Sequence, residues 1–212
     1  MDRDEAQARM REIQRIMERA TLWTLLPGLP AVIGGCLVLV GCAVSWGMFR
    51  SLDFAALVTM SFNAQAAFCV MWFAIGVLAV LVEVVLTAQA ATRQGLQPTV
   101  RSARLAAFSM TPSVVVAMVL TVKFLAAPEP RPDEIRYIVP IWMMLYGSGV
   151  YTAGLFSIRP PRILGVIFIV TGVCALLAFP QYGVVTAALS FGLLHIAFGL
   201  YIMRRQRQGG TS

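Results

Sequence analysis

Residues 183–203 read GVVTAALSFGLLHIAFGLYIM, a run without a charged residue, and arginines follow at positions 204, 205 and 207. About 20 predominantly apolar residues suffice for a helix to cross a bilayer, because each residue adds about 1.5 Å. The run therefore predicts a transmembrane helix whose lower end is fixed at Arg204. It also contains the only histidine of the chain, His195.

The composition extends this prediction to the whole chain. Of its 212 residues, 58% are apolar and 13% are charged, whereas soluble domains average about 45–50% and 25%. The chain has no room for both a bundle of spans and a sizeable soluble domain. The net charge of +7 is not arranged as a basic stripe interleaved with exposed aromatic residues, so nucleic acid is excluded as a direct partner.

The fold class we expect is an all-α membrane protein, a six-transmembrane-helix bundle with an N-terminal cytoplasmic amphipathic helix. The membrane domain would cover 27–203 and precede a basic cytoplasmic tail, 204–212. The six spans are expected at about 31–49, 66–91, 105–126, 135–157, 163–179 and 183–203.

The connections between spans give further expectations. The stretch before the second span, with Asn63 and Gln65, is compatible with an interfacial helix on the far side of the membrane. Pro112 predicts a kink near the start of the third span, because proline removes a backbone donor. Residues 159–162, RPPR, predict a tight turn before the fifth span, and the short segment 179–183 predicts that the last two spans form an antiparallel hairpin.

The N-terminal segment, 1–26, has the pattern of an amphipathic helix. Met10, Ile13 and Met17 are spaced to lie along one apolar stripe. Five arginines balance five acidic residues there, so attraction to anionic lipid should be modest. The simplest interpretation is a helix lying on the cytoplasmic ends of the spans. The alternative is a docking stripe for a second copy of the chain or for a cytoplasmic protein.

The distribution of basic residues predicts the orientation. Thirteen of the 17 basic residues lie in the N-terminal segment, the second and fourth connections and the C-terminus, all on one side of the predicted bundle. Cytoplasmic connections carry an excess of lysine and arginine. Both termini are therefore expected in the cytoplasm.

Three segments of the chain resemble a family of bacterial six-span membrane proteins of uncharacterised function. They are MERATLWTLLPGLPAVIGG at 17–35, TRQGLQPTVRSAR at 92–104 and FPQYGVVTAALSFGLLHIAFGLYIM at 179–203. The resemblance implies a multi-pass protein of the bacterial inner membrane, sometimes encoded near winged-helix regulators. It brings no catalytic residue and no substrate.

Ionisable residues inside spans are costly, by about 2.5–3.5 kcal/mol on insertion scales, and are therefore candidates for function. Glu83 and His195 have similar predicted depths, about 15 Å and 12 Å from the cytoplasmic ends of their spans. Ala188, Gly192 and Gly199 share a small-residue face with His195, which predicts that the histidine faces another helix. We expect either a Glu83–His195 pair that exchanges a proton or binds a cation, or a structural interhelical hydrogen bond, or no contact between the two residues.

The secondary candidates have simpler alternatives. Lys123 is expected near the outer end of the third span, where it can reach the interface as an anchor. Asn63 and Gln65 are expected near the outer boundary of the membrane, where they either line the entrance to a pathway or lie in the hydrated interface. The four cysteines and eleven methionines show no metal-binding spacing, and catalytic and nucleotide-binding motifs are absent. We therefore expect no metal, no cofactor and no enzymatic activity.

Three functional classes remain. The first is a transporter or channel component for a small solute or ion, using Glu83 and His195 and requiring a polar cavity that reaches the middle of the membrane. The second is a sensory or scaffolding protein with a dry core, which binds a partner through its N-terminal helix. The third is a membrane-embedded enzyme acting on lipid, for which the sequence offers few polar residues.

Overall fold

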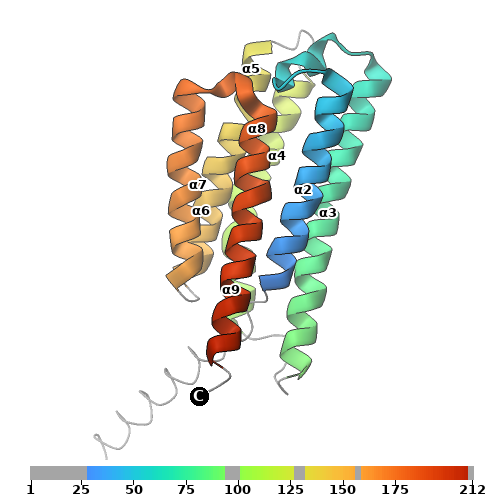
Figure 1. Cartoon of the computed structure of the whole chain (residues 1–212). Helices are drawn as coiled ribbons and strands as arrows, with labels where there is room; N and C mark the ends of the chain where they lie inside the picture. The colour runs from blue at the N-terminus through green and yellow to red at the C-terminus, as the bar shows by residue number, and fades with distance from the viewer. Residues whose placement is uncertain (1–27, 94–100, 127–131, 156–158, 210–212) are drawn as a thin grey trace, which may run out of the picture.

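The computed structural model describes residues 28–93, 101–126, 132–155 and 159–209, and these residues are overwhelmingly helical (Figure 1). The N-terminal helix expected at 1–26, with Met10, Ile13 and Met17, lies outside the described residues. In chain order the elements are α2 (Gly28–Phe49), η1 (Phe54–Thr59), α3 (Phe62–Arg93), α4 (Arg101–Leu125), α5 (Pro132–Arg136), α6 (Ile138–Leu155), α7 (Arg159–Ala178), η2 (Pro180–Tyr182), α8 (Gly183–Ala187), η3 (Ala188–Leu194) and α9 (His195–Gly209).

Six helical segments of the described chain are long and apolar enough to cross a membrane. One of them combines α5 with α6, and another runs continuously from η2 through α8 and η3 to α9. The start of α2 and the end of α9 lie at the same end of the bundle (Figure 1). The prediction of a multi-pass helical membrane protein is confirmed, whereas the side on which this end lies stays a prediction.

The connection between the first two spans differs from the expectation. A short 3-10 helix, η1, covers Phe54–Thr59, and α3 begins at Phe62. Asn63 and Gln65 therefore lie in the first turn of the long second span, and the expected interfacial helix is replaced by η1. The Gln65 side-chain amide donates to the carbonyl oxygens of Leu57 and Met60, both at 3.1 Å, and so holds η1 on top of α3.

The expected tight turn at 159–162 is also wrong, because α7 begins at Arg159. Pro160 and Pro161 lie in its first turn, where the backbone N–H groups have no intrahelical partner and proline costs nothing. Arg162 then donates from Nε to the Gly154 carbonyl oxygen at 2.7 Å. This bond satisfies a carbonyl group near the end of α6 and fixes the α6–α7 corner.

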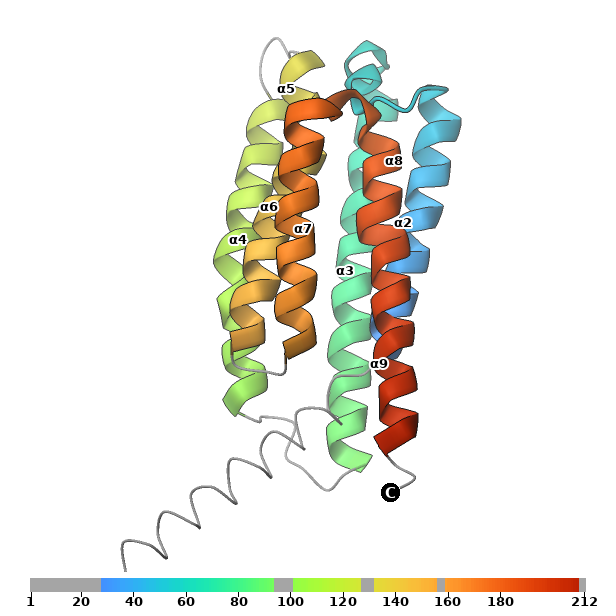
Figure 2. The same ribbon diagram turned by 60° about the vertical axis from the view of Figure 1, so that its left-hand side comes forward.

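The spans form two groups of three. The first group contains α2, α3 and the last span, and the second contains α4, α6 and α7 (Figure 2). Within them, α2 packs mainly on the last span and α6 mainly on α7. The last two spans are joined by the short η2 turn, and Phe168 of α7 contacts Phe191 and His195 of the last span. Each of these spans nevertheless has its main packing partner elsewhere.

Glycines determine which spans pair. A methyl group at Gly35 would lie 2.6 Å from the Gly192 carbonyl oxygen, and one at Gly147 would lie 2.7 Å from the Gly165 carbonyl oxygen. Backbones approach this closely only where side chains are missing. The first contact joins α2 to the last span, and the second joins α6 to α7. Helices in lipid gain no hydrophobic energy by associating, so such close packing carries much of their attraction.

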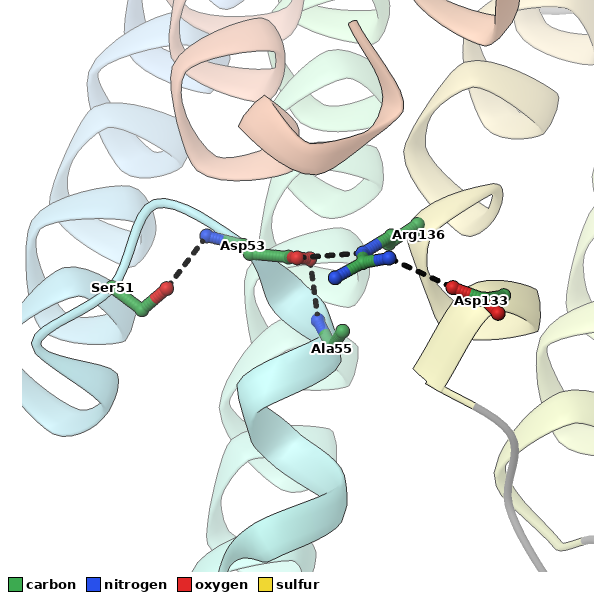
Figure 3. A network of polar contacts seen from close by, with 5 residues as sticks. All are labelled: Ser51, Asp53, Ala55, Asp133 and Arg136. Carbon is green, nitrogen blue, oxygen red and sulfur yellow. Dashed lines mark hydrogen bonds and ion pairs between the residues drawn. The ribbon is translucent and has the colours of Figure 1, made fainter.

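At the η1 end of the bundle, an ion-pair network joins the two groups (Figure 3). Arg136 on α5 donates from Nε to Asp53 and from Nη1 to Asp133, both at 2.7 Å. Asp53 also accepts a hydrogen bond from the Ala55 N–H at 2.8 Å and thereby caps η1. The same carboxylate thus fixes the connection of the first group and holds it against the second.

The glycine contact predicts unequal effects at adjacent positions. Gly35→Ala should destabilise the protein by about 1–3 kcal/mol, because the added methyl group forces α2 away from the last span. Gly34 has nothing within 4 Å of such a group, so Gly34→Ala is the matched control. Thermal unfolding in a mild detergent measures both. Equal unfolding temperatures for the two variants would contradict the proposed pairing.

Because Asp53 both pairs with Arg136 and caps η1, we expect its replacement to destabilise the protein more than replacement of Arg136. Arg136→Gln removes the ion pair, which is partly exposed and worth at most about 1 kcal/mol. Asp53→Ala also removes the cap of η1, at a further cost of about 0.5–2 kcal/mol. Unfolding temperatures should therefore fall more for Asp53→Ala than for Arg136→Gln. The reverse order would show that the cap contributes little.

Candidate functional site

His195 and Tyr146 meet in the middle of the bundle. The Tyr146 hydroxyl oxygen lies 2.7 Å from Nε2 of His195. Tyr146 is near the centre of α6 and His195 begins α9, so this hydrogen bond joins the two groups of spans at mid-depth. The prediction that His195 faces another helix is consistent with this contact.

The second ring nitrogen of His195 fixes the direction of the hydrogen bond. Nδ1 lies 3.3 Å from the carbonyl oxygen of Ser190, and a carbonyl oxygen can only accept. Nδ1 therefore carries the proton of the neutral imidazole, and Nε2 presents its lone pair. Tyr146 is the donor to Nε2. Both ring nitrogens are then satisfied within the protein.

Three aromatic rings surround the imidazole. The ring centroids of Tyr146, Phe168 and Phe191 lie 5.3, 5.2 and 6.1 Å from that of His195. Phe168 is completely buried, and Phe191 is stacked on the imidazole with an interplanar angle of 15°. The rings come from α6, α7 and η3 and enclose the Tyr146–His195 bond in apolar surroundings, where a hydrogen bond is stronger than in water.

The helix before His195 is irregular. Residues Ala188–Leu194 form a π-helix, with Ser190 and Gly192 buried. Such segments are rare in helices and are frequent at functional sites. Here the wider turn leaves the Ser190 carbonyl group within reach of the His195 ring, so the backbone irregularity and the orientation of the histidine are coupled.

Glu83 lies on α3, and its side chain is exposed in the absence of a bilayer. Thr87 donates to its Oε1 at 3.3 Å. Glu83 and His195 form no hydrogen bond with each other in the described part of the chain, where each has other partners. The reason is that α3 packs on α2, whereas His195 turns towards α6 and α7.

The position of α3 follows from polar and steric contacts with α2. Trp72 donates from its indole N–H to Ser45 at 3.1 Å, and Ser45 donates to the Gly41 carbonyl oxygen at 2.7 Å. A methyl group at Gly41 would lie 2.6 Å from Ile75. These contacts hold the upper part of α3, while Glu83 lies lower on the same helix.

The secondary candidates separate into structural and surface residues. Gln65 supports η1, as described above, and Asn63 is exposed beside it. Lys123 is exposed in the last turn of α4, in agreement with an interfacial anchor. None of the three residues is hydrogen-bonded to Tyr146 or His195 in the described part of the chain. Among the described residues, no group of three histidine, cysteine, aspartate or glutamate side chains is arranged to hold a metal ion.

Tyr146 is the residue that the sequence prediction missed. It lies in the run IVPIWMMLYGSGVY at 138–151, and tyrosines are expected at the ends of spans, where the ring reaches the interface. The hydroxyl group of a tyrosine at the centre of a span needs a hydrogen-bond partner inside the protein. The central position of Tyr146 in its span was therefore the sequence signal for this pairing, since a histidine in another span can be such a partner.

Comparisons with known protein families, curated proteins and solved structures find no match to this chain. The resemblance to a bacterial six-span family therefore stays a prediction. The class that the fold defines is a multi-pass helical membrane protein.

The bonding of His195 predicts a single tautomer. In histidine-labelled protein, nitrogen NMR should show one neutral ring with a protonated Nδ1 and an unprotonated, hydrogen-bonded Nε2. Tyr146→Phe should shift the Nε2 signal towards that of a free lone pair and destabilise the protein by about 0.6–2 kcal/mol. Because the chain has one histidine, the assignment is unambiguous. A protonated Nε2 in the neutral wild-type ring would contradict this geometry.

Proposed function

We propose that this protein moves protons across the membrane, alone or coupled to a small solute, through Glu83, Tyr146 and His195. The observation that carries the proposal is the Tyr146–His195 hydrogen bond, which crosses between the two groups of spans at mid-depth. Transporters commonly bind their substrate or coupling ion near the membrane midplane, between structural halves and beside interrupted helices. The π-helix before His195 supplies such an interruption.

Glu83 supplies the ionisable group on a third helix. An intramembrane carboxyl group is expensive and is normally paired or part of an ion pathway. Among the described residues, no basic side chain forms an ion pair with Glu83. The carboxyl group is therefore suited to accept and release a proton.

The proposed transfer conserves protons at each step. Protonated Glu83 gives its proton to the Tyr146 oxygen as the original hydroxyl proton passes to Nε2 of His195. The products are a Glu83 carboxylate, a neutral tyrosine and an imidazolium ion. Release of one proton from the imidazolium restores the neutral ring. A water molecule or an approach of α3 is required to join Glu83 to Tyr146.

The groove at α2 and α8 does not provide this pathway. It is lined by apolar side chains and the ring of Trp46, and neither Glu83 nor His195 belongs to its lining. The transfer therefore relies on the side-chain series, with the two groups of spans moving relative to each other. Such a motion would have to break polar links between the groups, among them Tyr146–His195 and Asp53–Arg136.

Proton flux into liposomes tests the proposal. Purified protein is reconstituted with a pH-sensitive dye inside the vesicles, and a potassium diffusion potential drives protons inward. Wild-type vesicles should acidify faster than empty ones. Glu83→Gln and His195→Gln should each reduce the protein-dependent rate by roughly a hundredfold, because a positioned proton donor or acceptor is lost.

Lys123→Gln is the control, since Lys123 is exposed on α4 away from the pair. It should leave the flux unchanged. Undiminished flux in Glu83→Gln would remove the carboxyl group from the pathway. Wild-type vesicles no faster than empty ones would favour the alternative, a non-enzymatic sensory or scaffolding protein that binds a cytoplasmic partner through the stripe of Met10, Ile13 and Met17.

A further inference from the structure

An apolar groove runs along the bundle surface between α2 and α8 at the η1 end. Its volume is about 340 Å³, and its walls include Cys42 and Trp46 from α2 and Val184 and Leu189 from the last span. Trp46 and Leu189 are 50% and 56% exposed. The groove therefore opens sideways, where the surrounding medium is lipid, and its shape is suited to a flexible hydrocarbon chain.

The end of the groove is held in place by the backbone. Leu52, which also lines it, accepts a hydrogen bond from the Val184 N–H at 3.0 Å. This bond ties the connection after α2 to the start of α8. The α2 side and the last-span side of the groove are therefore joined at this end by a backbone hydrogen bond.

Arg50 lies at the same end of the groove. Its guanidinium carbon lies 5.9 Å from the centroid of the Trp46 ring, a cation–π contact with a groove residue. Arg50 has a positive φ of 51°, and its N–H donates to the Trp46 carbonyl oxygen at 2.8 Å. Glycine usually takes this position after a helix, because other residues are strained there. The arginine thus brings a cation to the groove at a conformational cost.

The positive charge of Arg50 has no acidic partner among the described residues. Asp53 is the nearest acidic residue in the chain, and its carboxylate is bound by Arg136 and by the Ala55 N–H. Arg50 follows Trp46 by four residues, about one helical turn. An unpaired cation therefore lies one turn beyond an apolar groove that opens to lipid.

We propose that this groove binds an anionic phospholipid of the surrounding bilayer, with the phosphate group at Arg50 and one acyl chain against Trp46, Val184 and Leu189. The match is one of shape and charge, because a single cation at one end of an apolar groove complements an amphiphile with an anionic head. This site lies apart from Glu83, Tyr146 and His195 and does not depend on their role in proton transfer.

Quenching of tryptophan fluorescence tests the site directly. The protein is reconstituted in vesicles that contain either phosphatidylglycerol or phosphatidylcholine brominated near the glycerol end of the acyl chains. The Trp46 signal is the difference between the wild type and Trp46→Phe. Its quenching should show about fivefold tighter association of the anionic lipid, as expected for one basic residue near a membrane surface.

Three variants separate this site from general charge effects. Arg50→Gln meets the same backbone strain but lacks the charge, so the fivefold preference should fall to about one. Lys123→Gln removes an exposed cation on α4 and should keep the preference. Ala43→Phe fills a position that lines the groove, and it should reduce quenching by the anionic lipid.

Two results would overturn the proposal. One is equal quenching by both lipids in the wild type, which would make Arg50 and Trp46 an ordinary interfacial anchor. The other is a preference that survives Arg50→Gln or is lost equally in Lys123→Gln, which would assign it to overall charge. Unfolding temperatures of all variants, measured in detergent, show whether each one is folded before its quenching is interpreted.

Discussion

The close approach of α2 and the last span is the constraint on which the remaining arrangement depends. Gly28 packs against Gly199, and Gly35 against Gly192, so backbone meets backbone at two levels. This contact fixes the rotation of the last span about its own axis. His195 lies between Gly192, which is in the π-helix, and Gly199 in the chain. With the glycines against α2, the imidazole is directed to α6 and α7.

Much of the fold could be predicted from composition and run length, because a bilayer leaves few alternatives. Backbone groups in lipid must be satisfied within helices, and about 20 apolar residues are needed to cross. The small-residue face of the last span was also visible in the sequence. Its partner was not, since glycines on α2, α6 and α7 all permit close packing and sequence order favours neighbours in the chain. Proximity along the chain suggested α7, which contacts the last span through Phe168 but is not its main partner.

The candidate site was predictable only in part, because the sequence shows which residues each helix carries but not how the helices are rotated against one another. Glu83 and His195 were identified by charge and depth, which are properties of single helices. Their relation depends on helix rotation, which is set by contacts such as Gly41 with Ile75 and Gly35 with Gly192. The sequence prediction missed Tyr146 because a tyrosine is ordinarily neutral near pH 7 and was not among the charged or titrating candidates. Its importance arises from a partner 49 residues away.

Two polar links that join the groups of spans in the described part of the chain differ in their surroundings. Asp53–Arg136 lies at the end of the bundle and is partly exposed, so solvent can replace each partner at little cost. Tyr146–His195 lies among aromatic rings, where breaking it leaves two polar groups without partners. Breaking the link at the η1 end therefore costs less than breaking the one at mid-depth. Protonation of His195 changes that balance, because Nε2 becomes a donor and Tyr146 must turn its own proton elsewhere. In the proton transfer that we propose, Glu83 would be the acceptor of that proton, and the charge of the imidazole and the packing of the two groups would then be coupled through one hydroxyl group.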